Sequence, residues 1–262
     1  MNLRAEKKVA LREKRYIREQ LIKVKRSEEL EALEEVFDKS TLMTLYRLLN
    51  LNVLTTIHGV VKAGKESKVY WGTLKNGLKV AVKIYLTSSS EFRRGMINYI
   101  EGDPRFQRVK RDTRSLIYLW AQKEFKNLQA AHSAGVSVPK PILVEKNILL
   151  MEFIGDDGSP APLLKEVEVK APTRLYREII NQVKKLYISA ELVHADLSEY
   201  NIMMLRGKPI LIDLSQSLHR EHPSSTMYLT RDLENINKYF IKLGVDVKPI
   251  PKILEDLKVW PP

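Results

Sequence analysis

Apolar residues recur at helical spacing near the start of the chain and at strand spacing in the next segment. Between residues 27 and 49 they are interrupted only at 38–41, which predicts two short packed helices. From 51 to 86 they form three short β-prone runs, separated at Gly64 and at Asn76-Gly77. Because Asn-Gly is a strong hairpin signal, we expect three antiparallel strands joined by tight turns.

The second half of the chain is predicted to be mainly helical. A helical pattern runs from Leu116 to Gly135, two strands are expected at 136–144 and 148–153, and Gly, Asp and Pro gather at 155–162. A helix beginning at Pro172, a strand at 209–212 and helices near 230–243 and 250–259 complete the pattern. The prediction is an α+β protein with a β-rich first lobe, a polar flexible insertion at about 87–112, and a mainly helical second lobe.

The composition is that of a globular protein. Of 262 residues, 44% are hydrophobic and 29% are charged, and no apolar run approaches the length that spans a bilayer. Without a secretory signal pattern, the expectation is a cytoplasmic protein with no membrane partner. With no cysteine, disulfides, thiolate catalysis and cysteine zinc sites are excluded.

Positive charge is concentrated at the start of the chain. The net charge is +12, and residues 1–27 hold ten basic and three acidic side chains. This pattern predicts a basic helical arm at 1–27, followed by helices at 28–50 that pack on the main domain. A solvated helix and a contact with RNA phosphates explain the arm equally well.

The most informative motif is H-x-D-x-x-x-x-N at residues 194–201, followed by a strand that ends at Asp213. This spacing places Asp196 beside a substrate hydroxyl, and Asn201 and Asp213 on a shared metal ion. The alternative is a polar loop in which Asp and Asn side chains only form turns.

A lysine in an apolar strand provides the second motif. Lys83 ends the run Val-Ala-Val-Lys, a pattern that presents lysine to the phosphates of ATP. Its charge needs a carboxylate, and Glu124 lies on the apolar side of the following helix. We therefore predict an ion pair between Lys83 and Glu124; the alternative is a lysine that extends to water.

The segment 59–66 matches a Walker A loop except that Glu66 replaces the magnesium-binding Ser or Thr. A Walker A loop also begins a helix, whereas the residues after Glu66 read as a strand. We therefore reject the P-loop and predict that Gly64 and Lys65 form the tip of a hairpin over phosphates.

These motifs follow one another in the order of the protein kinase architecture. The chain also resembles the RIO atypical protein kinases, specifically the Rio-one branch, over most of residues 36–243. The matching stretches are 36–42, 64–66, 69–70, 80–85, 99–106, 136–141, 151–155, 194–201, 212–217 and 231–236.

The resemblance implies a bilobal RIO-type kinase fold without the peptide-substrate subdomains. Only 49 residues follow Asp213 and none of them form Ala-Pro-Glu, which agrees with that expectation. The Gly-, Asp- and Pro-rich segment at 155–162 places the lobe boundary there, with the first lobe at 51–155 and the second at 156–262. By resemblance, Met151, Glu152 and Ile154 form the hinge that holds adenine.

The resemblance also implies the activity, cofactors and partners. It indicates an ATP- and Mg2+- (or Mn2+-) dependent serine/threonine kinase or ATPase in which Asp213 can accept the phosphoryl group. It further implies a role in small ribosomal subunit maturation, with precursor rRNA and ribosomal proteins as partners and a Ser/Thr protein substrate. Ser198 departs from the ordinary kinase pattern, because a phosphate-stabilising lysine is usual there.

Two other functions stay open. A small-molecule kinase of the aminoglycoside or choline type uses a similar motif at 194–201, but needs a larger C-terminal lobe than 49 residues provide. An ATP-gated assembly factor would bind nucleotide with negligible phosphate transfer to other proteins.

Overall fold

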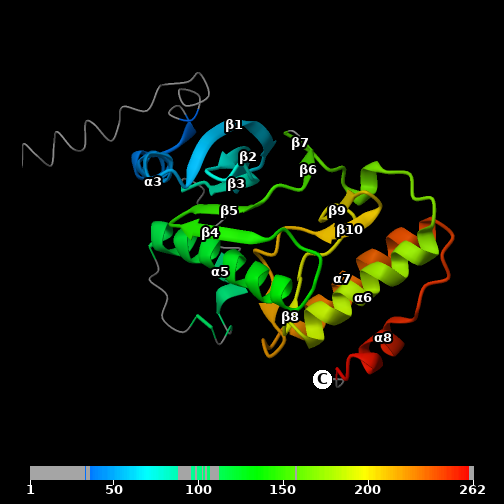
Figure 1. Ribbon diagram of the computed structural model, residues 1–262. Helices are drawn as coiled ribbons and strands as arrows, with labels where there is room; N and C mark the ends of the chain where they lie inside the picture. Colours follow the sequence, from blue (N-terminus) through cyan, green and yellow to red (C-terminus); the bar gives the residue numbers. More distant parts are fainter. Residues whose placement is uncertain are drawn as a thin grey trace, which may run out of the picture.

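A five-stranded antiparallel sheet forms the first half of the computed structural model (Figure 1). The structure describes residues 33, 36–87, 96–97, 99–101, 103, 105–106, 112–156 and 158–259. The strands, in the spatial order β1-β2-β3-β5-β4, are β1 (Leu54–Ala63), β2 (Ser67–Leu74), β3 (Lys79–Tyr85), β4 (Pro141–Glu145) and β5 (Ile148–Glu152). The predicted turns at Gly64 and at Asn76-Gly77 join β1 to β2 and β2 to β3, and Gly77 takes the positive φ that such a turn favours.

Helices pack against the two faces of this sheet. Helix α3 (Lys39–Asn50) begins at Asp38, whose carboxylate accepts hydrogen bonds from the Ser40 and Thr41 N–H groups. Its apolar side chains pack in a hydrophobic cluster with Val82 and other side chains from one face of the sheet. Helix α5 (Thr113–Ser133) lies on the other side, where its Trp120 packs in a cluster with Tyr85.

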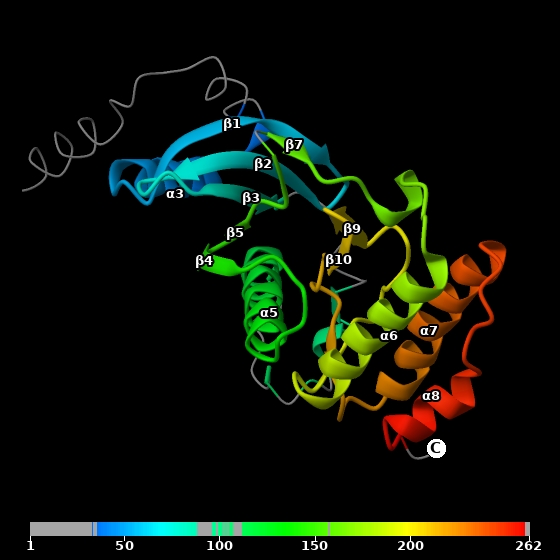
Figure 2. The same cartoon turned by 45° about the vertical axis from the view of Figure 1, so that its right-hand side comes forward.

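The second half is built around helices α6 (Pro172–Ile188), α7 (Ser225–Lys242) and α8 (Ile250–Asp256) (Figure 2). The hairpin of β9 (Ile202–Leu205) and β10 (Lys208–Leu211) lies between these helices and the sheet. Shorter elements are β6 (Gly155–Asp156), β7 (Ser159–Pro160), the 3-10 turn η1 (Leu164–Glu166), β8 (Leu192–Val193) and β11 (Leu218–His219). A β-rich first half followed by a mainly helical second half confirms the predicted α+β class.

Several predicted boundaries were wrong: α3 begins at Lys39, inside the break expected at 38–41, and α8 ends at Asp256 instead of 259. The strand expected to begin at 136 begins at Pro141. Pro139 lies just before it and has no N–H group to donate to a neighbouring strand. The helix expected near 230 begins earlier, at Ser225. Hydrophobic period marks the body of an element better than its ends, because end residues are determined by caps and neighbouring contacts.

The insertion expected at 87–112 is only partly covered by the described residues, and the basic arm at 1–27 lies outside them. Where the insertion is described, it includes buried apolar side chains: Met96, Ile100 and Phe106 pack against Trp120 of α5. The lobe limits themselves stay a prediction. None of the helices in the described ranges has the length and apolar character needed to cross a bilayer.

Candidate functional site

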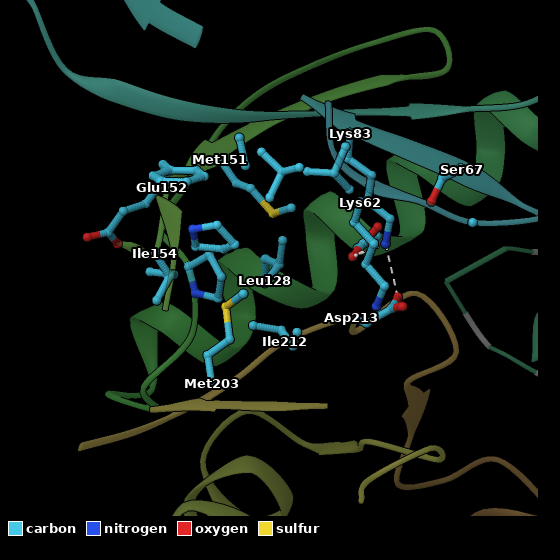
Figure 3. Close-up of a pocket in the computed structure, with 18 of the residues that line it drawn as sticks. Lys62, Ser67, Lys83, Leu128, Met151, Glu152, Ile154, Met203, Ile212 and Asp213 are labelled. Carbon is cyan, nitrogen blue, oxygen red and sulfur yellow. Dashed lines mark hydrogen bonds and ion pairs between the residues drawn. The ribbon is translucent and has the colours of Figure 1, made fainter. Parts of the chain in front are cut away.

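A cleft of about 360 Å³ lies between the sheet and the β9–β10 hairpin. One end is apolar and the other is charged, as Figure 3 shows: Met151, Ile154 and Met203 lie at one end, and Lys62, Lys83 and Asp213 at the other. The remaining lining residues are Val61, Gly64, Lys65, Glu66, Ser67, Val69, Ala81, Glu124, Leu128, Pro139, Glu152, Phe153, Pro160 and Ile212. Such a cleft suits a ligand with an apolar ring system and an anionic tail.

Lys83 joins two carboxylates at the charged end of the cleft. Its Nζ lies 2.9 Å from Oε1 of Glu124 on α5 and 3.0 Å from Oδ1 of Asp213 (Figure 3). The Glu124 side chain is 1% exposed, and Tyr85 donates a hydrogen bond to its second oxygen. The predicted ion pair between Lys83 and Glu124 is therefore confirmed, and the two carboxylates raise the pKa of Lys83 against the opposing effect of burial.

Asp213 is held by one of its two carboxylate oxygens. Oδ1 accepts from Lys83 and, at 2.8 Å, from the hydroxyl of Ser215. Oδ2 accepts no hydrogen bond from the described residues. Although burial opposes it, the attraction of Lys83 lowers the pKa of Asp213, so the group is ionised at neutral pH. Its backbone is strained, with φ of +63°, as functional residues held by their surroundings often are.

Asp196 and Asn201 meet on the loop before β9. The Asn201 Nδ2 donates to the Asp196 backbone carbonyl at 2.8 Å and to its Oδ2 at 3.0 Å. The Ile212 N–H donates to the Asn201 carbonyl at 3.0 Å, which brings this loop beside Asp213. Burial, and then repulsion from Asp213, raise the pKa of Asp196, which favours its accepting a proton.

The sequence reading missed the support beneath this loop. Asp232 of α7 is 1% exposed, and its two oxygens accept from the Ala195 and Leu197 N–H groups, each at 2.8 Å. These residues flank Asp196, and Ala195 has a φ of +67°. Asp232 therefore holds the strained backbone that presents Asp196. No signal within residues 194–201 points to a carboxylate 36 positions later.

His194 of the same motif has a structural role. Its side chain is buried, and Nε2 lies 3.1 Å from the Ile212 carbonyl. Burial lowers its pKa to about 4, so the ring is neutral at pH 7 and donates its proton from Nε2 to that carbonyl. This bond fixes the loop against the strand end that precedes Asp213.

The predicted hinge residues lie at the apolar end of the cleft. Met151, Glu152 and Ile154 all line it (Figure 3). The Glu152 N–H donates to the Lys140 carbonyl, and the Ile154 carbonyl accepts from Ala161. The Ile154 N–H has no hydrogen-bond partner within the described ranges, so it is available to a ligand.

The hairpin between β1 and β2 covers the charged end. The Gly64 N–H donates to the Ser67 carbonyl at 2.9 Å, and Gly64, Lys65 and Glu66 all line the cleft. Burial, followed by repulsion from the Asp213 carboxylate, raises the pKa of Glu66. The hairpin prediction is confirmed for its shape; its contact with phosphates stays a prediction.

Lys62 was missed by the sequence reading. It pairs with Val69 of β2, and Val69 pairs with Lys83 of β3. Directly paired residues point to the same face of a sheet, so Lys62 and Lys83 project into the cleft from the same row. The sequence does not reveal that Lys62 faces the cleft, because the pairing of β1 with β2 shifts register between Val60 and Lys62.

Asn201 and Asp213 fit the metal site predicted for them. The Oδ1 atom of Asn201 and Oδ2 of Asp213 both lack partners among the described residues. Three or more His, Asp or Glu side chains arranged to hold a metal do not occur in the described part of the chain. A pair of oxygen ligands suits magnesium, which is commonly bound by one or two side chains together with substrate phosphates.

Comparison with known proteins agrees with this geometry. Residues 68–253 match the RIO domain family. The serine/threonine kinase Rio1 of Methanocaldococcus jannaschii is 42% identical over 219 residues, covering 84% of this chain and 74% of that protein. Human RIO1 is 35% identical over 239 residues, covering 90% of this chain but only 42% of the human protein. The chain thus spans less than half the length of that relative.

Solved structures share the fold. The Rio2 kinase of Chaetomium thermophilum superposes with a TM-score of 0.66 at 25% identity, covering 82% of this chain and 65% of that one. A second structure, the ADP/Mg2+-phosphoaspartate complex of this Rio2 kinase, has a TM-score of 0.63 at 24% identity, covering 83% and 65%. Together with the arrangement of Lys83, Glu124, Asp196 and Asp213, these similarities show that the chain belongs to the RIO family and, within it, to the Rio1 branch.

Proposed function

We propose that this protein is an ATP- and magnesium-dependent phosphotransferase of the RIO type. The observation that carries the proposal is the position of Lys83, which contacts both Glu124 and Asp213 at the charged end of a cleft. A cation held between a buried carboxylate and a metal-binding carboxylate is the arrangement used to orient the phosphates of ATP in kinases.

The cleft supports binding of the whole nucleotide. Its apolar end matches the adenine ring, and the free N–H of Ile154 together with the Glu152 backbone supports the proposed hinge contacts. Lys83 and Lys62 face the phosphates from the sheet. Asn201 and Asp213 would hold magnesium, or manganese in its place, which neutralises charge that develops on the transferred phosphoryl group.

Two phosphoryl acceptors are compatible with the site. A Ser or Thr hydroxyl of a protein substrate would attack the γ-phosphorus while Asp196 accepts its proton and ADP leaves. Alternatively, a carboxylate oxygen of Asp213 would attack the γ-phosphorus and displace ADP, forming an acyl phosphate that water then hydrolyses to aspartate and phosphate. The phosphoaspartate in the related Rio2 structure supports this second route for the family fold. We propose that Asp213 carries out this second reaction, which makes the protein an ATPase.

The test is to incubate the protein with γ-labelled ATP and magnesium and then expose it to hydroxylamine. Acyl phosphates release their label, whereas Ser and Thr phosphates keep it. We expect labile label in the wild type and in Asp246→Asn, an exposed control, and none in Asp213→Asn. Stable label that disappears in Asp196→Ala would mean hydroxyl phosphorylation instead. An absence of both label and turnover would favour an ATP-gated assembly factor.

We further propose that the protein acts on precursors of the small ribosomal subunit, through rRNA and ribosomal proteins. The family and the net charge of +12 support this proposal. Deleting residues 1–26 should leave ATP affinity unchanged and reduce the salt dependence of RNA binding. An identical salt slope after the deletion would contradict an RNA role for the arm.

The small-molecule kinase is the weaker alternative. Within the described ranges, β11, α7 and α8 follow Asp213, and this part of the chain belongs to the match with the RIO domain family up to residue 253, which supports the RIO-type function over that alternative. Phosphorylation of an aminoglycoside or choline by the purified protein would revive that alternative.

A further inference from the structure

Two polar side chains of α5 contact the backbone just after Asp213. The Lys123 Nζ donates to the carbonyl of Ser215 at 3.0 Å and to that of Ser217. The Asn127 Nδ2 donates to the carbonyl of Leu214 at 2.7 Å and to that of Ser217 at 3.2 Å. Three carbonyls of the segment 214–217 are thus held from one helix.

These donors lie in the interior. Lys123 and Asn127 are each 0% exposed, so an unmet hydrogen bond on either would carry the full cost of desolvation. Burial lowers the pKa of Lys123 to about 7, and the nearby charge of Arg105 acts in the same direction. A neutral amine has two N–H bonds, which matches the two carbonyls that Lys123 contacts.

Arg105 orients the Asn127 amide. Its Nη1 donates to the Asn127 Oδ1 at 2.8 Å, while its other nitrogens bind the carboxylate of Asp103 at 2.9 and 2.6 Å. Because the amide oxygen is engaged by Arg105, the amide nitrogen must face the carbonyls of Leu214 and Ser217. A residue from the stretch before α5 therefore acts on the segment after Asp213 through one side chain.

The same helix also holds the other side of the site. Glu124, adjacent to Lys123, binds Lys83, and Lys83 binds Asp213. The contacts therefore form a closed ring, which runs from α5 through Lys83 to Asp213 and back to α5 through the carbonyls of 214–217. The strained φ of +63° at Asp213 needs such redundant support.

We propose that Lys123 and Asn127, with Arg105 orienting the latter, are positioning residues that fix Asp213 in the place from which it binds magnesium. We call these three side chains the carbonyl clamp. The inference rests on the proposed function, because it concerns the same metal-binding carboxylate. Helix α5 then has two roles, because it supplies Glu124 and also positions Asp213.

The test compares Lys123→Met with Lys126→Met. Methionine has a similar length but no donor, and Lys126 is an exposed lysine of the same helix. Binding of Mg2+-ADP and of adenosine is measured by calorimetry, and hydrogen exchange of the peptide spanning 213–218 is measured without nucleotide. For Lys123→Met we expect about tenfold weaker Mg2+-ADP binding, unchanged adenosine binding and about tenfold faster exchange. Lys126→Met should match the wild type in all three measurements.

Two further substitutions guard against a variant that does not fold. Asn127→Asp keeps the shape and loses both N–H donors. Arg105→Met, at a half-buried position, removes the orienting contact together with the ion pair to Asp103. Each should weaken Mg2+-ADP binding while leaving adenosine binding unchanged. A folded variant of any of the three that binds Mg2+-ADP as tightly as the wild type would overturn the proposal. A wild type that binds no Mg2+-ADP would instead overturn the proposed function.

Discussion

The Nζ of Lys83 lies 3.0 Å from Oδ1 of Asp213, although 130 positions separate the two residues in the chain. The contact connects the central strand of the sheet to the segment that follows the β9–β10 hairpin. It raises the pKa of Lys83 and lowers that of Asp213, so both groups stay charged over the neutral range. The sheet and the segment after the β9–β10 hairpin therefore share one electrostatic centre.

The buried pair of Lys83 and Glu124 should be costly to break from one side only. Their side chains are 7% and 1% exposed, so Lys83→Met leaves a carboxylate uncompensated and should lower the free energy of unfolding by about 3–5 kcal/mol. The double variant Lys83→Met/Glu124→Leu should recover part of this loss. Urea unfolding of the single and double variants measures the difference.

A surface ion pair supplies the control for that experiment. Arg47 and Glu145 lie 3.0 Å apart, close to the 2.9 Å of the buried pair, but Arg47 is 64% exposed, so Arg47→Met should cost less than about 1 kcal/mol. Equal losses for Lys83→Met and Arg47→Met would contradict the role of burial.

Lys62 should contribute to binding phosphates and not to binding adenine. We expect Lys62→Met to weaken ATP binding about tenfold or more, as for the loss of a charged hydrogen bond, and to leave adenosine binding unchanged. Lys68→Met is the matched control, because Lys68 pairs with Ile84 and thus points to the opposite face of the sheet. Calorimetric titration with both ligands separates the effects; equal weakening for adenosine would show that Lys62 acts only on the shape of the cleft.

Lys123 should make stability depend on pH above neutrality. Its pKa is lowered to about 7 in the folded state from 10.5 in the unfolded chain, so the unfolded state binds more protons between these values. The free energy of unfolding should therefore rise by about 1.4 kcal/mol per pH unit from pH 7 towards 10, relative to Lys123→Met. Urea unfolding at pH 7.5 and 9.5 tests this; parallel curves for the two proteins would mean that Lys123 does not titrate in that window.

Replacing Gly158 by alanine should lower the free energy of unfolding for two reasons, the backbone conformation and a clash with a neighbouring side chain. Its φ is +83°, and a Cβ atom would lie 2.7 Å from the ring of Trp71. Gly207 has a φ of +79° but open space around it. Gly207→Ala should cost about 1–2 kcal/mol from backbone strain, and Gly158→Ala should cost more, because Trp71 must also move. Thermal unfolding of both variants measures the difference; equal losses would show that Trp71 yields freely.

Local signals in the sequence predicted most of the elements and part of the site. Hydrophobic periodicity and the turn residues at Gly64 and Gly77 were sufficient to predict the strands of the sheet, because those signals act between neighbours in the chain. Lys83 and Glu124 could be paired in advance, since a charge in an apolar strand requires a partner and the next helix offers one. The motif at 194–201 assigned Asp196 and Asn201 to one site, because they lie close together in the chain.

Contacts between distant segments were decided only by the tertiary structure. The Asp232 carboxylate beneath Ala195 and the carbonyls bound by Lys123 depend on how α7 and α5 pack, and the pairing that turns Lys62 into the cleft depends on a register shift. These side chains satisfy backbone groups that carry no residue-specific signal, because every residue has a carbonyl and nearly every residue an N–H. The sequence by itself therefore determined the reacting groups and their order, whereas only the packing decided which buried polar side chains hold those groups in place.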